Sequence, residues 1–230
     1  MIPLADDNPH RTLPVVTVLL IALCGLAFLW QLQGPWGFEA SVGLLGFIPV
    51  RLLGDMSVYA DAGDFPTEAW ATLLTSMFLH GSVAHIGGNM LYLWVFGDNL
   101  EAVLGRVRFV LFYLLCGVLA ALTEGILAPQ SEIPMVGASG AISGVLGAYL
   151  VLFPRQRVTV ALPYVGITEL PALVVLGMWF VYQFVYALAE AQSGASAGIA
   201  FGAHLGGFIA GAVLVWFFGP NLRRGPKLWE

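Results

Sequence analysis

Residues 137–153 read GASGAISGVLGAYLVLF, a run of small and apolar residues that contains no charged side chain. Its length is close to the roughly 20 residues that a helix needs to cross the hydrocarbon core of a bilayer. Gly140 and Gly144 lie on one face of such a helix and form a small-xxx-small pattern, which lets two membrane helices approach closely. The stretch therefore predicts a tightly packed membrane helix over about 138–153, with Ser139 in its first turn.

Five further apolar runs flank this segment in the 230-residue chain, at about 14–32, 83–103, 107–127, 170–190 and 199–218. Hydrophobic residues make up 59% of the chain and charged residues only 10%, where a soluble domain has roughly 25% charged residues. We therefore predict an all-α, polytopic membrane protein with six transmembrane helices, the first an uncleaved anchor. The net charge of −5 leaves no basic surface for nucleic acid.

The basic residues alternate along the chain in a way that predicts the topology. Cytoplasmic loops are enriched in Lys and Arg, and eight of the nine basic residues fall in the segments expected on one side of the membrane. They are Arg11, Arg106, Arg108, Arg155, Arg157, Arg223, Arg224 and Lys227. This pattern predicts cytoplasmic tails at 1–13 and 220–230 around a membrane domain at 14–219.

Residues 33–69 differ from the other connections because they mix aromatic and aliphatic residues with Gly, Pro and several acids. We interpret them as an outer loop that lies partly in the membrane interface, as amphipathic monotopic segments do. A plain apolar-rich loop is the alternative. The two cysteines, Cys24 and Cys116, lie in apolar runs and are typical of small buried side chains, with no metal or disulfide motif.

A few strongly polar residues lie inside the predicted spans, where they are costly and mark candidate functional sites. His85 and Asn89 are four residues apart and share a helix face, and His80 lies at or just before the start of that helix. Ser139 and His204 lie near the outer ends of two other helices. At 1.5 Å per residue, the polar groups of all three helices fall within about 10 Å of the outer surface.

We expect close contact along the glycine-rich faces to bring the Ser139 hydroxyl within hydrogen-bond reach of the His204 imidazole, which is the geometry that a nucleophile and its base require. For each residue taken singly, a purely structural role in interhelical hydrogen bonding is the alternative. A zinc site of His80, His85 and His204 lacks a supporting carboxylate or HExxH motif. A transporter pathway for protons or ions is a third alternative, but the polar groups cluster near one face without a convincing inverted repeat.

The motifs resemble those of the rhomboid intramembrane serine proteases. GASG at 137–140 is similar to the family's GxSG motif, AHLGGFIAG at 203–211 to its AHxxGxxxG helix, and HIGGN at 85–89 to its HxxxN motif. The resemblance extends to FLH at 78–80 and to the inner end of the second helix at 97–106. It therefore covers nearly the whole chain and implies a six-helix bundle.

The resemblance implies a catalytic dyad of Ser139 as nucleophile and His204 as general base. It implies an oxyanion hole made by the side chains of His85 and Asn89 with the Ser139 backbone N–H, with His80 in a supporting role. No cofactor is implied. The expected substrates are single-span or other transmembrane proteins in the bilayer of a bacterial inner membrane, cleaved from the outer face, although an organellar origin is an alternative. A non-catalytic binder of membrane helices is the alternative function within the family.

Two positions depart from the family pattern. The family often has Trp-Arg before the second helix, where this chain has Trp70-Ala71. Many members also carry an aromatic residue four positions after the nucleophile, where it stacks on the catalytic histidine, but this chain has Ser143. We expect His204 to be held less firmly, or Ser143 to supply a hydrogen bond instead.

Overall fold

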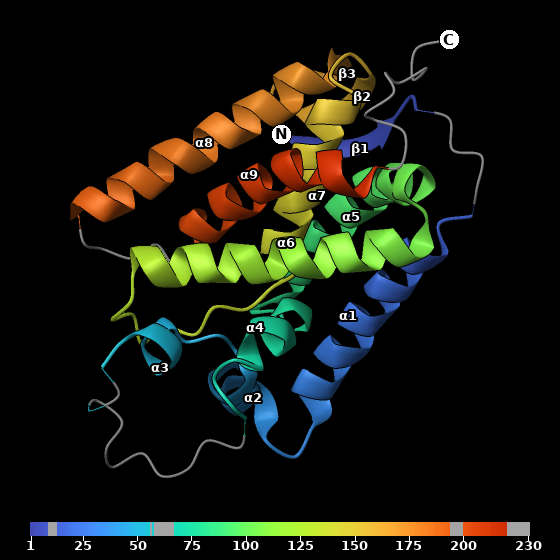
Figure 1. The fold of residues 1–230 in the computed structure, drawn as a ribbon. Coiled ribbons are helices and arrows are strands. Elements are labelled where there is room, and N and C mark those ends of the chain that lie inside the picture. Colours follow the sequence, from blue (N-terminus) through green and yellow to red (C-terminus); the bar gives the residue numbers. More distant parts are fainter. Residues whose placement is uncertain (9–12, 56, 58–66, 194–199, 220–230) are drawn as a thin grey trace.

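A computed structural model describes residues 1–8, 13–55, 57, 67–193 and 200–219 (Figure 1). It contains six long helices, which are α1 (Val15–Gln33), α5 (Val83–Leu104), α6 (Arg106–Leu127), α7 (Ser139–Leu152), α8 (Ala172–Ser193) and α9 (Phe201–Phe218). The prediction of a mostly helical membrane bundle is confirmed. Four of these helices, α1, α6, α8 and α9, are long and apolar enough to cross a bilayer, so the chain is a multi-pass membrane protein.

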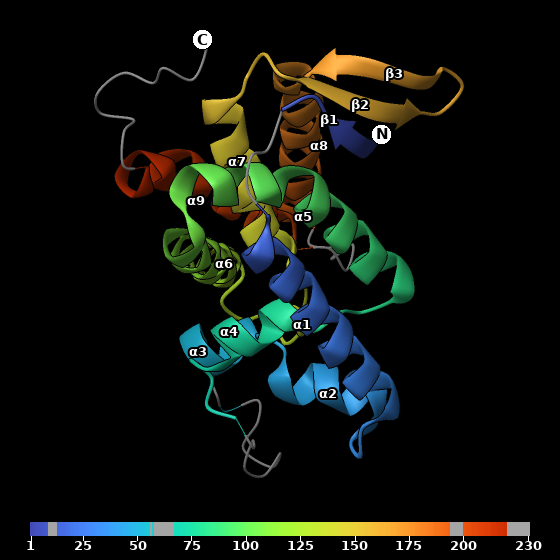
Figure 2. The same cartoon turned by 90° about the vertical axis from the view of Figure 1, so that its right-hand side faces the viewer.

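The helix α7 is the central element of the bundle. It packs against α9, α6 and α5, and Figure 2 shows it between α9 and α5. All nine residues from Ala141 to Tyr149 are buried. With 14 residues it is about 21 Å long, shorter than the roughly 30 Å hydrocarbon core. Because protein rather than lipid surrounds α7, its ends need not reach both membrane surfaces.

Glycines set the distance between α7 and α9. Gly207 and Gly211 on α9 face the backbone carbonyls of Gly140 and Gly144 on α7, and a Cβ at either α9 position would overlap those oxygens. This contact confirms the small-xxx-small packing expected from the sequence. The other glycine pair of α9 faces α6 instead, and consists of Gly202 and Gly206.

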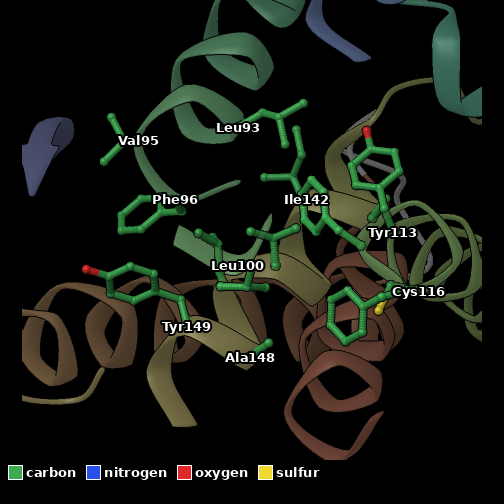
Figure 3. Close-up of a cluster of buried hydrophobic side chains, with 14 of the residues drawn as sticks. Leu93, Val95, Phe96, Leu100, Tyr113, Cys116, Ile142, Ala148 and Tyr149 are labelled. Carbon is green, nitrogen blue, oxygen red and sulfur yellow. The ribbon is translucent and has the colours of Figure 1, made fainter. Parts of the chain in front are cut away.

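The hydrophobic core lies where α5, α6 and α7 meet (Figure 3). Phe96 of α5 and Tyr149 of α7 form an edge-to-face pair with ring centroids 4.9 Å apart. Ile142 of α7 and Cys116 of α6 extend the same cluster, which explains why this cysteine is buried and unpaired. The core thus ties the central helix to both of its neighbours on this side.

The first turn of α6 holds Arg106 and Arg108, which the sequence analysis placed in a connection between helices. Gly105 alone separates α5 from α6, and its φ of 78° suits glycine at this sharp turn.

The buried Glu101 of α5 accepts hydrogen bonds from the backbone N–H of Thr17 at 2.8 Å and from its hydroxyl at 3.0 Å. A carboxylate thus satisfies the start of α1 and joins the two helices.

A small antiparallel sheet closes one end of the molecule and was not predicted from the sequence. Its order is β1 (Ile2–Asp6), β2 (Arg157–Leu162) and β3 (Gly166–Pro171). Asn99 of α5 donates a hydrogen bond to Asp6 at 2.9 Å, which ties β1 to the bundle. The sheet places the N-terminal segment beside the connection between α7 and α8. Arg11 lies outside the described residues.

The segment expected as an interfacial loop contains the short helices α2 (Gly37–Leu45) and α3 (Pro49–Leu53), and lies at the opposite end from the sheet (Figures 1 and 2). Residues 56 and 58–66 of the loop fall outside the described part. Phe47 and Met135 form an antiparallel bridge that ties it to the strand-like segment before α7. The hydroxyl of Thr75 in α4 (Thr72–Thr75) donates to the Leu45 carbonyl at 2.6 Å. This contact holds the loop close to Trp70-Ala71, where the family often has Trp-Arg.

Candidate active site

Ser139 and His204 are hydrogen-bonded to each other. Ser139 is the first residue of α7, and His204 lies in the first turn of α9. The Nε2 atom of His204 is 2.8 Å from the Oγ atom of Ser139, and both residues are half-buried. The contact between the glycine faces of α7 and α9 brings these two residues together, as expected from the sequence.

A carboxylate from α6 holds the start of α9. The backbone N–H of Ala203 donates to Oε2 of Glu124 at 2.9 Å. The first N–H groups of a helix have no intrahelical acceptor, and a carboxylate there also complements the helix dipole. Glu124 therefore fixes the turn that carries His204, a role that was not predicted from the sequence.

The second ring nitrogen of His204 contacts Gln183 of α8. The amide Oε1 of Gln183 lies 2.9 Å from Nδ1 of His204, and the side chain is buried. Trp179, one turn earlier on α8, lies beside the imidazole with ring centroids 6.0 Å apart. Gln183 was not predicted from the sequence, although a polar residue in the apolar run 170–190 is the same signal that identified His85 and His204.

The helix α5 begins so that His85 and Asn89 face the same region. The hydroxyl of Ser82 accepts the backbone N–H of His85 at 3.1 Å and caps the helix. The N–H of Gly81 donates to Nδ1 of His85 at 3.4 Å, so Nε2 carries the proton and is free to donate. Nδ2 of Asn89 is buried and has no hydrogen-bond partner among the described residues.

The backbone just before α7 lies against these two side chains. Gly137 has a φ of 126° and donates its N–H to the Ser76 carbonyl at 2.9 Å. A Cβ at Gly137 would come within 2.8 Å of Nε2 of His85 and 3.5 Å of Nδ2 of Asn89. Only glycine tolerates both the backbone angle and the close approach, so this position brings α5 next to the start of α7.

A single cavity of about 780 Å³ joins these groups. Its lining includes the side chains predicted on three helices and the one found on α8, namely His85, Asn89, Ser139, His204 and Gln183. Apolar residues of the segment before α7, from Ile133 to Val136, line the same cavity. The volume is in the range of sites that bind small molecules or peptide segments.

His80 lies behind the cavity and does not contribute to its lining. Its backbone N–H donates to Gln31 of α1 at 2.9 Å, and its ring packs edge-to-face on His85 with centroids 5.3 Å apart. Burial, followed by the proximity of His85, lowers the pKa of His80 to about 4, so the ring is neutral at pH 7. In the described part of the chain, no group of three His, Cys, Asp or Glu side chains is placed to share a metal ion.

Ser143 does not reach His204. Its hydroxyl donates to the carbonyl of Ser139 at 2.7 Å, a bond within α7 of the kind that serines often make in helices. The aromatic neighbours of His204 come from other positions instead. They are Trp179 of α8 and Phe201 of α9, the latter with ring centroids 6.4 Å from the imidazole.

The family model of the Rhomboid domain matches residues 67–221, more than half of the chain. The chain belongs to the rhomboid family. The matched range contains both helix starts that carry the Ser139–His204 pair, and it begins before the α5 segment that holds His85 and Asn89.

Named rhomboids from bacteria and mitochondria resemble parts of the chain. Rhomboid protease GluP of Bacillus subtilis is 40% identical over 88 residues, which are 38% of this chain and 17% of that protein. Rhomboid protein 1, mitochondrial, of Saccharomyces cerevisiae is 31% identical over 155 residues, 66% of this chain and 39% of that protein. Putative rhomboid protease YdcA of Bacillus subtilis is 35% identical over 91 residues, 39% and 45% of the two chains. The chain therefore spans less than half the length of these relatives.

Proposed function

We propose that this rhomboid is a serine endopeptidase that hydrolyses peptide bonds in or beside the transmembrane segments of other membrane proteins. The observation that carries the proposal is the 2.8 Å contact between Nε2 of His204 and Oγ of Ser139 at the edge of a large cavity. A serine hydroxyl is a weak nucleophile unless a base removes its proton, and this pair has the required reach. Relatives named as rhomboid proteases support the same chemistry.

In the proposed first step, Ser139 Oγ attacks the scissile carbonyl carbon while its proton passes to Nε2 of His204. The carbonyl oxygen then carries a negative charge. Nε2–H of His85, Nδ2–H of Asn89 and the backbone N–H of Ser139 are the donors proposed to hold it. Each such donor stabilises the transition state by roughly 3 kcal/mol. The unpartnered Nδ2 of Asn89 supports this role, because a buried donor without a partner otherwise costs free energy.

In the proposed second step, the tetrahedral intermediate collapses, the peptide C–N bond breaks, and His204 gives its proton to the departing amine. Water then hydrolyses the acyl-enzyme, with His204 again acting as base. A peptide bond inside a helix is inaccessible until the helix unwinds locally. We therefore propose a preference for Gly or Pro near the cleavage site, because both weaken a helix, and for a small residue such as Ala at the cleaved position.

The proposed location is a bacterial inner membrane, with both termini in the cytoplasm and the cavity toward the outer face. The arginines support this orientation, because Arg155 and Arg157 lie at the sheet end, with the N-terminal segment. The cavity lies away from the sheet, beside the segment that bridges to α2 and α3. Substrate would thus be cleaved near the outer surface.

Cleavage of a tagged single-span membrane protein by the purified rhomboid in detergent tests the proposal. We compare the native chain with Ser139→Ala and His204→Ala, and use Ser41→Ala as a matched serine variant, because Ser41 lies outside the cavity on α2. The native chain and Ser41→Ala should cleave, and the other two should not. Native protein that gives no product, or product that persists in Ser139→Ala, would contradict the proposal and favour a helix-binding or transport role.

A further inference from the structure

Gln183 is a buried polar residue on the otherwise apolar face of α8 that lies next to His204. The neighbours of Gln183 along the chain, Tyr182 and Phe184, are about half exposed, whereas Gln183 is only 6% exposed. A buried amide in an apolar helix is costly unless its hydrogen bonds are satisfied. Its described partner is Nδ1 of His204 at 2.9 Å. The side chain thus points at the imidazole rather than at lipid.

The direction of this hydrogen bond fixes the proton on His204. An amide oxygen accepts and never donates, so the ring nitrogen that faces Oε1 of Gln183 must carry the hydrogen. A neutral imidazole has one N–H, and placing it on Nδ1 leaves Nε2 with a lone pair. That lone pair faces Oγ of Ser139 at 2.8 Å. The opposite tautomer would present N–H to the serine and could not take its proton.

Trp179 adds a second contact from the same face of α8. It lies four residues before Gln183, and its ring is 6.0 Å from the imidazole and stacks on Phe208 of α9 at 5.8 Å. The aromatic ring limits tilting of the imidazole, and the amide limits its rotation about the Cβ–Cγ bond. Together they restrain His204 from α8, whereas the Ser143 hydroxyl bonds to the Ser139 carbonyl and makes no contact with the imidazole.

We propose that Gln183 is a positioning residue that completes a Ser139–His204–Gln183 chain and holds His204 in the tautomer needed for general-base catalysis. This inference rests on the proposed protease function. Gln183 itself exchanges no proton. The serine proton moves to Nε2 of His204 and later to the leaving amine, while Nδ1–H stays bonded to Oε1 throughout. The amide is neutral, so it orients the imidazole without adding the charge that a carboxylate would bring.

Gln183→Leu and Gln183→Glu test this role, with Phe184→Leu as the matched control on the lipid-facing side of α8. Gln183→Leu removes the acceptor while keeping an apolar side chain, and should lower kcat by at least about tenfold with KM nearly unchanged. Phe184→Leu should cleave like the native chain. A purely structural amide predicts instead that the leucine variant, once folded, keeps the native kcat.

Gln183→Glu gives a readout that packing alone would not move. A carboxylate beside Nδ1 favours the imidazolium, so the acidic limb of the kcat–pH profile should shift to higher pH by about one unit. The other titratable groups facing this end of α9 in the described part of the chain include His85 of α5, Glu124 of α6 and Tyr186 of α8, and all three are unchanged in the variants. Their contribution therefore cancels in the comparison.

The two measurements together decide the proposal. A fall in kcat for Gln183→Leu, or an upward shift of the acidic limb for Gln183→Glu if the leucine variant does not fold, supports it. Native kcat in a folded Gln183→Leu, or an unshifted limb in Gln183→Glu, overturns it. If the native rhomboid cleaves no substrate at all, the proposed function fails instead, and the two failures are distinguished by the native chain alone.

Discussion

Asn89 is the residue whose buried donor most directly tests the proposed oxyanion hole. We expect Asn89→Ala to lower kcat by about 100-fold, because one donor to the developing charge is lost. KM should change little, since the ground-state carbonyl carries no full charge. Steady-state cleavage by the purified variant measures both constants, and thermal unfolding checks that it is folded. A folded variant with native kcat would contradict the role of Asn89.

Ser143 provides the opposite prediction at the same scale. Its hydroxyl donates to the Ser139 carbonyl within α7 and makes no contact with His204. We expect Ser143→Ala to keep kcat within about threefold of the native value, because such bonds within a helix contribute little. The same cleavage assay measures it beside Ser139→Ala. A loss as large as that of Ser139→Ala would mean that Ser143 holds the imidazole of His204, in place of the neighbouring rings of Trp179 and Phe201.

Sequence reasoning found individual site residues where polarity stood out from an apolar background. Ser139, His204, His85 and Asn89 all line the cavity, as their common depth along three helices predicted. Gln183 was missed because it lies alone in its span, with no motif or glycine face beside it. Which way a lone glutamine points depends on how α8 rotates against α9, and helical periodicity in a uniformly apolar run does not fix that rotation.

At the scale of helix pairs, the contact between α7 and α9 is the element on which the site depends. We expect Gly211→Ala to lower the free energy of unfolding by about 2 kcal/mol, because its methyl group overlaps the Gly144 carbonyl and forces the helices apart. Thermal unfolding in detergent measures this as a fall in Tm. The displaced His204 should also reduce cleavage in the folded fraction.

Gly25→Ala is the matched control for that prediction. Gly25 lies in α1, and a Cβ there meets no atom within 4 Å. Alanine also favours helix over glycine by about 1 kcal/mol. Gly25→Ala should therefore unfold at the native Tm or slightly above it. Equal destabilisation by both substitutions would show that the α7–α9 contact is not specially sensitive to an added methyl group.

The sequence predicted the helices well and the sheet not at all. The six apolar runs agree with the helices to within about three residues, because lipid demands a long apolar stretch for each crossing. The strands β1 and β2 are short and pair residues that lie far apart in the chain, such as Ile2 with Ala161. No local pattern reveals such a pairing, since the partner of β1 lies far away along the chain.

At the scale of the whole molecule, the testable claim is the direction in which the bundle crosses the membrane. We expect Glu132→Cys to react with a membrane-impermeant maleimide added to intact cells. Arg155→Cys should react only after the membrane is opened, because basic residues favour the cytoplasmic side. Both positions are exposed in the structure, and the native Cys24 and Cys116 are buried. The reverse labelling pattern would invert the topology and place the cavity toward the cytoplasm.

The proposed function depends above all on Ser139 and His204 acting together as nucleophile and base. Its most direct test is to map the site of a fluorophosphonate adduct by peptide mass spectrometry, on the folded native rhomboid and on His204→Ala. We expect an adduct on Ser139 in the native protein, in which Oγ bonds to phosphorus and fluoride leaves, and none in the variant. Labelling at another serine, or equal labelling of Ser139 without His204, would contradict it.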